Sequence, residues 1–228
     1  MKNNASQPEW QAVIDIGSNS VRLVIYDVAG RALLPHYNEK VMARLGASLS
    51  KRGHLSREGQ KIAMKAIRRY HAILKGLKVK NVRAVATAAV RRASDGSEFV
   101  ALIEEETGIR VDIIDGAEEA RLSALGVSGS VFQAEGVVGD LGGSSLEFAR
   151  LSSGKIKSAE THMLGPLAIN LDGLGREDIQ SMVRKALAQS RVLQKGGERF
   201  YMVGGAWRAL AKLHMSCLLY TSPSPRDS

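Results

Sequence analysis

Two short stretches of this sequence join an acidic residue to a turn rich in glycine and serine. The first reads Asp-Ile-Gly-Ser-Asn-Ser-Val-Arg from Asp15 to Arg22, and the second reads Asp-Leu-Gly-Gly-Ser-Ser-Leu-Glu from Asp140 to Glu147. A turn of this composition can direct several backbone N–H groups at one point and bind an anion there. A carboxylate at the start of the turn can hold a divalent cation or order its waters. The chemistry indicated is therefore the binding of a phosphate together with a metal.

The elements that must position these turns are strands. Apolar residues precede each turn (12–14 and 137–138) and follow it (23–26 and 148–149), which favours a β-hairpin over a strand that leads into a helix. A single hairpin of this kind is common in proteins. Two copies predict a duplicated fold whose halves face each other across a phosphate and a metal.

Hydrophobic periodicity predicts an α/β protein in which two similar halves follow one another. In the first half we expect strands at residues 12–16, 21–28, 32–43, 82–87 and 109–114, and helices at 56–75, 95–108 and 115–125. In the second half we expect strands at residues 137–141, 145–151, 155–163 and 200–203, and helices at 177–193 and from 206 onward. Asp95 and Asp115, each followed three residues later by a glutamate, are the expected N-caps of their helices.

The composition is that of a globular protein with an excess of positive charge. The chain of 228 residues is 44% hydrophobic and carries a net charge of +9, and no apolar run approaches the length of a membrane span. Its polar start lacks the apolar core of a signal peptide, so we expect a cytoplasmic protein without a membrane partner. The charge fits either a polyanionic partner or solvated basic helix faces. Nucleic acid is disfavoured as that partner, because aromatic residues make up only 5% of the chain.

Five blocks that occur in order along the chain resemble the exopolyphosphatase/guanosine pentaphosphate phosphatase family, a branch of the actin-like ATPase superfold. The blocks are Asp15 to Arg22, Val85 to Arg91 (Val-Ala-Thr-Ala-Ala-Val-Arg), Asp115 to Arg121 (Asp-Gly-Ala-Glu-Glu-Ala-Arg), Asp140 to Glu147, and Val203 to Arg208 (Val-Gly-Gly-Ala-Trp-Arg). The resemblance covers about residues 11–215. It implies a duplicated actin-like ATPase (ribonuclease H-like) fold, release of the terminal phosphate of polyphosphate or of the 5′-terminal phosphate of guanosine pentaphosphate, Mg²⁺ as the cofactor, and a homodimer for the full-length protein.

The resemblance also predicts the domain organisation. We expect a disordered segment at residues 1–10, a complete actin-like subdomain at 11–130 and a truncated second subdomain at 131–216. Residues 217–228 resemble one reading frame of a sequencing-library adapter and interrupt the helical pattern, so they are interpreted as non-native; a genuine Ser/Pro-rich tail is the alternative. A truncated second half predicts little activity for the 228-residue chain.

The five blocks carry the residues to which the resemblance assigns roles. Asp15 and Asp140 would organise the Mg²⁺, which prefers few carboxylates and keeps several waters. Arg22 and Arg91 would contact phosphate, because a planar guanidinium matches two phosphate oxygens, although Arg22 could instead lie on a strand face. The phosphate oxygens would be bound by backbone N–H groups of the two turns, namely Gly17, Ser18, Asn19, Ser20, Gly142, Gly143, Ser144 and Ser145.

The general base is expected in the third block. Glu118 is the third residue of a capped helix and is expected to cap it, whereas Glu119 matches the catalytic glutamate of the family. The positive end of the helix would favour the ionised form of Glu119, which can orient or deprotonate water. The alternative role for Glu119 is simple stabilisation of the first helical turn.

The fourth block departs from the family pattern at two positions. Ser144 stands where the third glycine of the turn is usual, and Leu146 stands where a hydroxyl residue is usual. Serine enters unusual turn conformations only at a cost, so the turn geometry and its phosphate affinity could differ. Glu147 is expected to line the metal or phosphate site; a strand-edge charge facing water is the alternative.

Three functions therefore remain open. A hydrolase that attacks phosphate chains with water fits the glutamate at the helix start and the basic chain. An ATP-dependent kinase or ATPase can be built on the same superfold, and fold alone does not separate the two. A non-catalytic phosphate or nucleotide sensor is favoured only if Ser144 and Leu146 disable the second turn.

Overall fold

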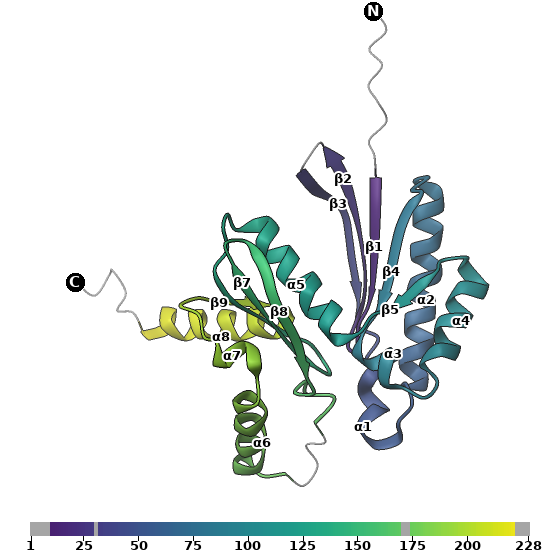
Figure 1. Ribbon diagram of the computed structural model, residues 1–228. Helices are drawn as coiled ribbons and strands as arrows, with labels where there is room; N and C mark the ends of the chain where they lie inside the picture. Colours follow the sequence, from purple (N-terminus) through teal and green to yellow (C-terminus); the bar gives the residue numbers. More distant parts are fainter. Residues whose placement is uncertain (1–9, 30–31, 170–173, 222–228) are drawn as a thin grey trace, which may run out of the picture. The chain divides into compact units, whose positions relative to one another are not determined.

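The computed structural model describes residues 10–29, 32–169 and 174–221, which fold into two α/β units (Figure 1). The first unit comprises residues 1–115 with 167–170, and the second comprises 116–166 with 171–228. The segments predicted to be disordered (1–10) and non-native (217–228) lie mostly outside the described residues, except that Trp10 begins a strand and 217–221 continue a helix.

The first unit is built on a five-stranded sheet with the strand order β3-β2-β1-β4-β5. Its strands are β1 (Trp10–Ile16), β2 (Val21–Ala29), β3 (Ala32–Val41), β4 (Asn81–Ala86) and β5 (Val111–Ile113). The first three strands pair antiparallel as successive hairpins, whereas β4 is parallel to β1 and β5 is parallel to β4. The carboxyl ends of β1, β4 and β5 therefore meet at one edge of the sheet, where the first Gly/Ser turn also lies.

Helices cover the buried face of this sheet. They are α1 (Leu49–Arg52), α2 (Arg57–Gly76), α3 (Ala88–Arg92) and α4 (Gly96–Thr107), with the 3-10 turn η1 (Leu45–Ser48) before α1. Buried and exposed residues alternate along β1, so that Ile14 and Ile16 face the core while Val13 and Asp15 do not. Apolar residues of α2 and α4 pack against the same cluster of side chains.

The second unit is built on a four-stranded sheet with the order β8-β7-β6-β9. Its strands are β6 (Gly136–Leu141), β7 (Leu146–Ser152), β8 (Lys155–His162) and β9 (Phe200–Val203), and its helices are α5 (Gly116–Ser130), α6 (Arg176–Ala188), α7 (Arg191–Gln194) and α8 (Gly205–Thr221). Ala120 and Ala124 of α5 pack on one face of the sheet, against Val138. On the other face, Phe148 packs with Val192 of α7.

The two sheets share one topology. In each, two antiparallel hairpins precede a strand that pairs parallel with the first strand of the sheet. The predicted duplication is confirmed, and among the described residues the second sheet ends at β9, the counterpart of β4. In the same part of the chain, no helix is both long and apolar enough to cross a membrane.

Several details differ from the sequence-based expectations. The predicted helix 177–193 is divided into α6 and α7, because the hydroxyl of Ser190 caps α7 by accepting from the N–H of Leu193 over 3.0 Å. The short helix α3 was not expected. Asp95 precedes α4, but its carboxylate accepts from the N–H of Leu55 and the side chain of Gln60 instead of capping its own helix.

The helix α5 is longer than predicted and ends at Ser130. It packs against β7 and β8, so the structure groups it with the second sheet, whereas the sequence placed the subdomain boundary after residue 130. The helix α8 runs to Thr221, so the expected interruption of the helical pattern at residue 217 is not observed.

Candidate functional site

The first loop, residues 17–20, closes the hairpin between β1 and β2. Asp15 pairs with Arg22 one position before the end of the ladder, and the N–H of Gly17 donates to the carbonyl of Ser20 over 2.9 Å. Asp15 is exposed on its strand, and Asn19 is exposed at the tip of the loop. The loop therefore presents its outer side to solvent.

The segment that follows β3 holds the inner side of the first loop. The N–H of Gly46 donates to the carbonyl of Ser18, and the N–H of Arg44 donates to the carbonyl of Asn19, each over 2.9 Å. Ser18 is buried, with 5% of its surface exposed. These bonds occupy carbonyl groups of the loop.

Arg22 and Arg91, the two predicted phosphate contacts, lie in different settings. The Nε of Arg22 donates to the side-chain oxygen of Asn38 over 2.9 Å, which places Arg22 on the strand face beside β3. Arg91 lies on α3 after the carboxyl end of β4, and its guanidinium donates to the carbonyl of Ile114, just after β5, over 2.6 Å. Arg91 is thus fixed at the sheet edge that also carries the first loop, where phosphate contact stays a prediction for both arginines.

The second loop, residues 142–145, closes the hairpin between β6 and β7 in the same way. Asp140 pairs with Glu147, and the N–H of Gly142 donates to the carbonyl of Ser145 over 2.9 Å. Ser144 and Ser145 are each only 1% exposed. Ser144 is not among the residues with positive φ, so the serine adopts an ordinary conformation where the family pattern has glycine.

The carboxylate of Asp140 is held by residues from two other elements. The hydroxyl of Ser123, on α5, donates to its Oδ2 over 2.5 Å. Gly204 lies on the other side with φ +102, and a Cβ there would come within 2.8 Å of Oδ1. The turn after β9 therefore needs glycine both for its backbone conformation and for its contact with Asp140.

The position of Glu119 follows from the same hydrogen bond. Glu119 precedes Ser123 by four residues on α5, and residues with this spacing share one face of a helix. Glu119 therefore lies on the helix face that meets Asp140. Its neighbour Glu118 has both carboxylate oxygens engaged by the guanidinium of Arg121, over 2.6 and 2.8 Å.

Glu147 is buried beside the start of the same helix. It is only 2% exposed, and its carboxylate accepts from the hydroxyl of Thr161 over 2.9 Å. Gly116, the first residue of α5, lies so close to Thr161 that a Cβ would be 2.2 Å from the Thr161 methyl group. The alternative interpretation of Glu147 as a water-facing strand-edge charge is wrong.

Sequence reasoning missed Ser123 and Thr161, which position the acidic residues. Neither contact had a signal in the local sequence. Ser123 bonds to Asp140 of another element, and the contact of Thr161 depends on the pairing of β7 with β8, in which Glu147 faces Thr161.

The acidic side chains of the second unit fit the expected Mg²⁺. Among the described residues, no group of three or more His, Cys, Asp or Glu side chains is arranged to hold a metal. Mg²⁺ uses one or two carboxylates, keeps waters and binds substrate phosphates, and the partly exposed Asp140 beside the second loop offers one such carboxylate.

Comparisons with known proteins show which sequences and structures this chain is similar to. A sequence model described as the Ppx/GppA phosphatase family matches residues 13–227. The crystal structure of the Aquifex aeolicus family member is 26% identical to this chain, with a TM-score of 0.75, and the alignment covers 94% of this chain and 71% of that one. An exopolyphosphatase from Cytophaga hutchinsonii is 25% identical with a TM-score of 0.78, over 94% of this chain and 72% of that one.

A more distant similarity concerns the fold alone. An inorganic polyphosphate/ATP-glucomannokinase from Arthrobacter is 17% identical, with a TM-score of 0.52, over 89% of this chain and 85% of that one. Together with the repeated strand order, these matches show the duplicated actin-like ATPase fold.

Proposed function

Because the chain belongs to the Ppx/GppA phosphatase family, we propose that it releases the terminal phosphate of inorganic polyphosphate, or the 5′-terminal phosphate of guanosine pentaphosphate, by attack of water. Family membership and the two solved relatives support a phosphohydrolase that acts on phosphoanhydrides. The observation that carries the finer proposal is the hydrogen bond between Ser123 and Asp140, since it orients α5 so that Glu119 lies on the face that meets the second loop.

In this proposal the two loops bind phosphate oxygens. Each loop offers backbone N–H groups at the end of a rigid hairpin, and the planar guanidinium of Arg91 adds a cationic contact at the edge of the first sheet. Asp15 beside the first loop and Asp140 beside the second are the candidate ligands of Mg²⁺, which would neutralise phosphate charge when bound. Positioning and charge neutralisation of this kind are the main requirements of phosphoryl transfer.

Glu119 is the proposed general base. Its carboxylate orients a water molecule and takes a proton from it as the water oxygen bonds to the terminal phosphorus. The bridging P–O bond breaks at the same time, and the leaving group is a phosphate chain shortened by one unit, or guanosine tetraphosphate. Glu118 cannot substitute in this role while both of its oxygens are held by Arg121.

The second candidate function is an ATP-dependent kinase or ATPase, which the likeness to a polyphosphate/ATP-dependent kinase keeps open. A kinase differs from the proposed hydrolase in the acceptor of the phosphoryl group, and an ATPase differs from it in the substrate. In ¹⁸O-labelled water, a hydrolase that attacks the terminal phosphorus places one labelled oxygen in each released phosphate.

The test uses purified chain with Mg²⁺ in labelled water, supplied in parallel with polyphosphate, guanosine pentaphosphate and ATP. Phosphate is quantified and its mass is measured under single-turnover conditions. We expect labelled phosphate from at least one of the first two substrates and less from ATP. Release from ATP alone, or an unlabelled product, would overturn the proposal.

A further inference from the structure

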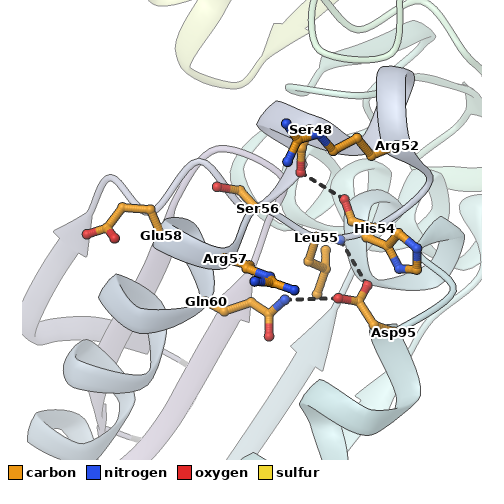
Figure 2. Close-up of a pocket in the computed structure, with 9 residues that line it drawn as sticks. All are labelled: Ser48, Arg52, His54, Leu55, Ser56, Arg57, Glu58, Gln60 and Asp95. Carbon is orange, nitrogen blue, oxygen red and sulfur yellow. Dashed lines mark hydrogen bonds between the residues drawn. The ribbon is translucent and has the colours of Figure 1, made fainter.

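A polar cavity of about 740 Å³ lies in the first unit, and no residue of the first loop is among its lining (Figure 2). It is formed by the end of α1, the connection to α2, the first turn of α2 and the residue that precedes α4. The lining side chains are Ser48, Arg52, His54, Leu55, Ser56, Arg57, Glu58, Gln60 and Asp95. We call this space the α1–α2 cavity.

The acidic groups of the α1–α2 cavity are already engaged. The carboxylate of Asp95 accepts from the N–H of Leu55 through one oxygen and from the side chain of Gln60 through the other, each over 2.9 Å. Glu58 points away from the other lining residues in Figure 2 and lies 3.9 Å from Lys61. Glu58 is therefore directed away from the cavity, whereas Asp95 lines it with a carboxylate that is bonded to two neutral donors.

The basic groups are not engaged. Among the described residues, Arg52 and Arg57 have no hydrogen bond or ion pair. In Figure 2 the guanidinium of Arg57 lies over Gln60 and points toward Asp95, on the cavity side of α2. The hydroxyl of Ser56 accepts from the N–H of Gly59 over 3.2 Å, so its own proton is available for donation. The cavity thus presents two guanidinium groups and a hydroxyl donor beside the single carboxylate of Asp95, which leaves an excess of positive charge.

The lining selects a phosphate chain rather than a nucleoside. A volume of about 740 Å³ is within the range of small-molecule sites, which is roughly 300–1,000 Å³. Leu55 is the one aliphatic residue of the lining, and no Phe, Tyr or Trp is present among the nine. A purine base would need an apolar or aromatic surface on which to stack, whereas guanidinium groups match phosphate oxygens in pairs.

We propose that the α1–α2 cavity is a second anion site, which binds an inorganic oligophosphate through Arg52, Arg57 and Ser56. The site does not depend on the proposed hydrolysis, since a chain without any activity would still bind the anion there. Hydrogen bonds of the η1 segment connect the α1–α2 cavity to the first loop. In that segment Ser48 donates to the carbonyl of His54 over 3.0 Å, and the N–H of Gly46 donates to the carbonyl of Ser18.

The experiment is an NMR titration of the whole chain with tripolyphosphate, without Mg²⁺ so that hydrolysis does not interfere. The side-chain amide of Gln60 and the backbone amides of Gly53 and Leu55 report on the cavity, and the amide of Gly17 reports on the first loop. The variants are R52Q and R57Q, singly and together, with R83Q as the matched control. Arg83 is an exposed arginine on β4 that does not line the cavity.

We expect tripolyphosphate to shift the cavity signals and each cavity variant to raise the Kd about tenfold, because a hydrogen bond to a charged group contributes about that much affinity. R83Q should leave the Kd unchanged, and adenosine should shift nothing. The inference is wrong if the cavity signals do not move, if R83Q weakens binding as much as R52Q, or if adenosine binds. In the double variant, a shift of the Gly17 amide signal would report binding of tripolyphosphate at the first loop alone. Loss of binding at the cavity is therefore distinguished from loss of binding at the first loop.

Discussion

In the first loop the N–H of Gly17 donates to the carbonyl of Ser20 over 2.9 Å, and in the second the N–H of Gly142 donates to the carbonyl of Ser145 over the same distance. The pairs that flank the loops differ more. Asp15 faces Arg22 across the first hairpin, and both side chains are at least partly exposed. Asp140 faces Glu147 across the second, where Asp140 is held by Ser123 and Glu147 is buried.

We propose that the two copies of one hairpin have different roles in phosphate binding. The first loop is open to solvent and is accompanied by two arginines, which suits recognition of a flexible anion. The second is closed in by neighbouring side chains and carries two acidic residues, which suits precise placement of a cation or a water molecule. Duplication supplied the same backbone geometry twice, and the neighbouring elements made it basic in one unit and acidic in the other.

The two loops are also supported differently. The first is held by hydrogen bonds from the segment after β3. That segment packs against Gly59 of α2, where a Cβ would come within 2.8 Å of the Ala43 carbonyl oxygen. The second is supported by Gly165, after β8, where a Cβ would lie 2.3 Å from the backbone carbon of Ser144. Close packing in place of hydrogen bonds predicts that the second loop tolerates substitution less well.

The largest effect on stability is expected for G165A. The added methyl group must displace the backbone of the second loop, so we expect the free energy of unfolding of the second unit to fall by about 3 kcal/mol, the upper part of the range for overpacking. The control is G126A, within α5, where no atom lies within 4 Å of the added Cβ and the change should stabilise the helix by about 0.5–1 kcal/mol.

The two tryptophans allow each unit to be followed separately. Trp10 lies on β1 of the first unit and Trp207 lies on α8 of the second, and the chain contains no other tryptophan. Urea unfolding of G165A in a W10F background therefore reports the second unit. A G165A variant as stable as its parent would contradict the packing of Gly165 against Ser144.

An intermediate effect is expected for S123A. The substitution removes a hydrogen bond to the Asp140 carboxylate, and bonds to charged acceptors contribute about 1.5 kcal/mol at the low end of their range. We expect the second unit to lose about that much stability, measured by urea unfolding. S130A is the control, since Ser130 lies on the same helix and bonds only to the backbone carbonyl of Gly126. Equal losses in the two variants would show that Asp140 gains nothing from Ser123.

A smaller effect is expected for G59A in the first unit. The Cβ would lie 2.8 Å from the Ala43 carbonyl, but alanine also favours the helix by about 0.5–1 kcal/mol, so a net loss of about 1 kcal/mol is expected. Urea unfolding followed by Trp10 fluorescence in a W207F background measures it. If G59A destabilised its unit more than G165A does, the proposed contrast between the two supports would be reversed.

The smallest effect concerns acid stability. Burial raises the pKa of the Glu160 carboxyl, but hydrogen bonds from Ser190, His162 and the Val192 backbone outweigh it, so the pKa lies below its ordinary value of 4.5. A depressed pKa in the folded state contributes stability above about pH 4.5, and this contribution is lost as pH falls through the folded value. We expect E160Q to lower the free energy of unfolding of the second unit at pH 7. We also expect this free energy to fall less steeply in the variant as pH drops below about 4.5, measured by urea unfolding at several pH values. An unchanged acid slope would contradict this role.

Local patterns predicted the hairpins, because each requires only a turn between two apolar runs. The fold class followed from their repetition. The helix capping of Asp95 and the undivided helix at 177–193 were wrong for a shared reason, namely that tertiary partners decided both. Asp95 bonds to Leu55 and Gln60, and Glu160 of β8 accepts from Ser190 at the point where the helix divides. Ser123 and Thr161 were missed because their partners are distant in the sequence.

The most direct test of the central claim compares two adjacent glutamates. E119Q and E118Q make the same change one residue apart, but Glu119 lies on the helix face that meets Asp140 and Glu118 is held by Arg121. Single-turnover phosphate release from polyphosphate should be abolished in E119Q, with polyphosphate binding retained, and should persist in E118Q. Release by E119Q at the rate of the unmodified chain would remove Glu119 from the mechanism and contradict the account.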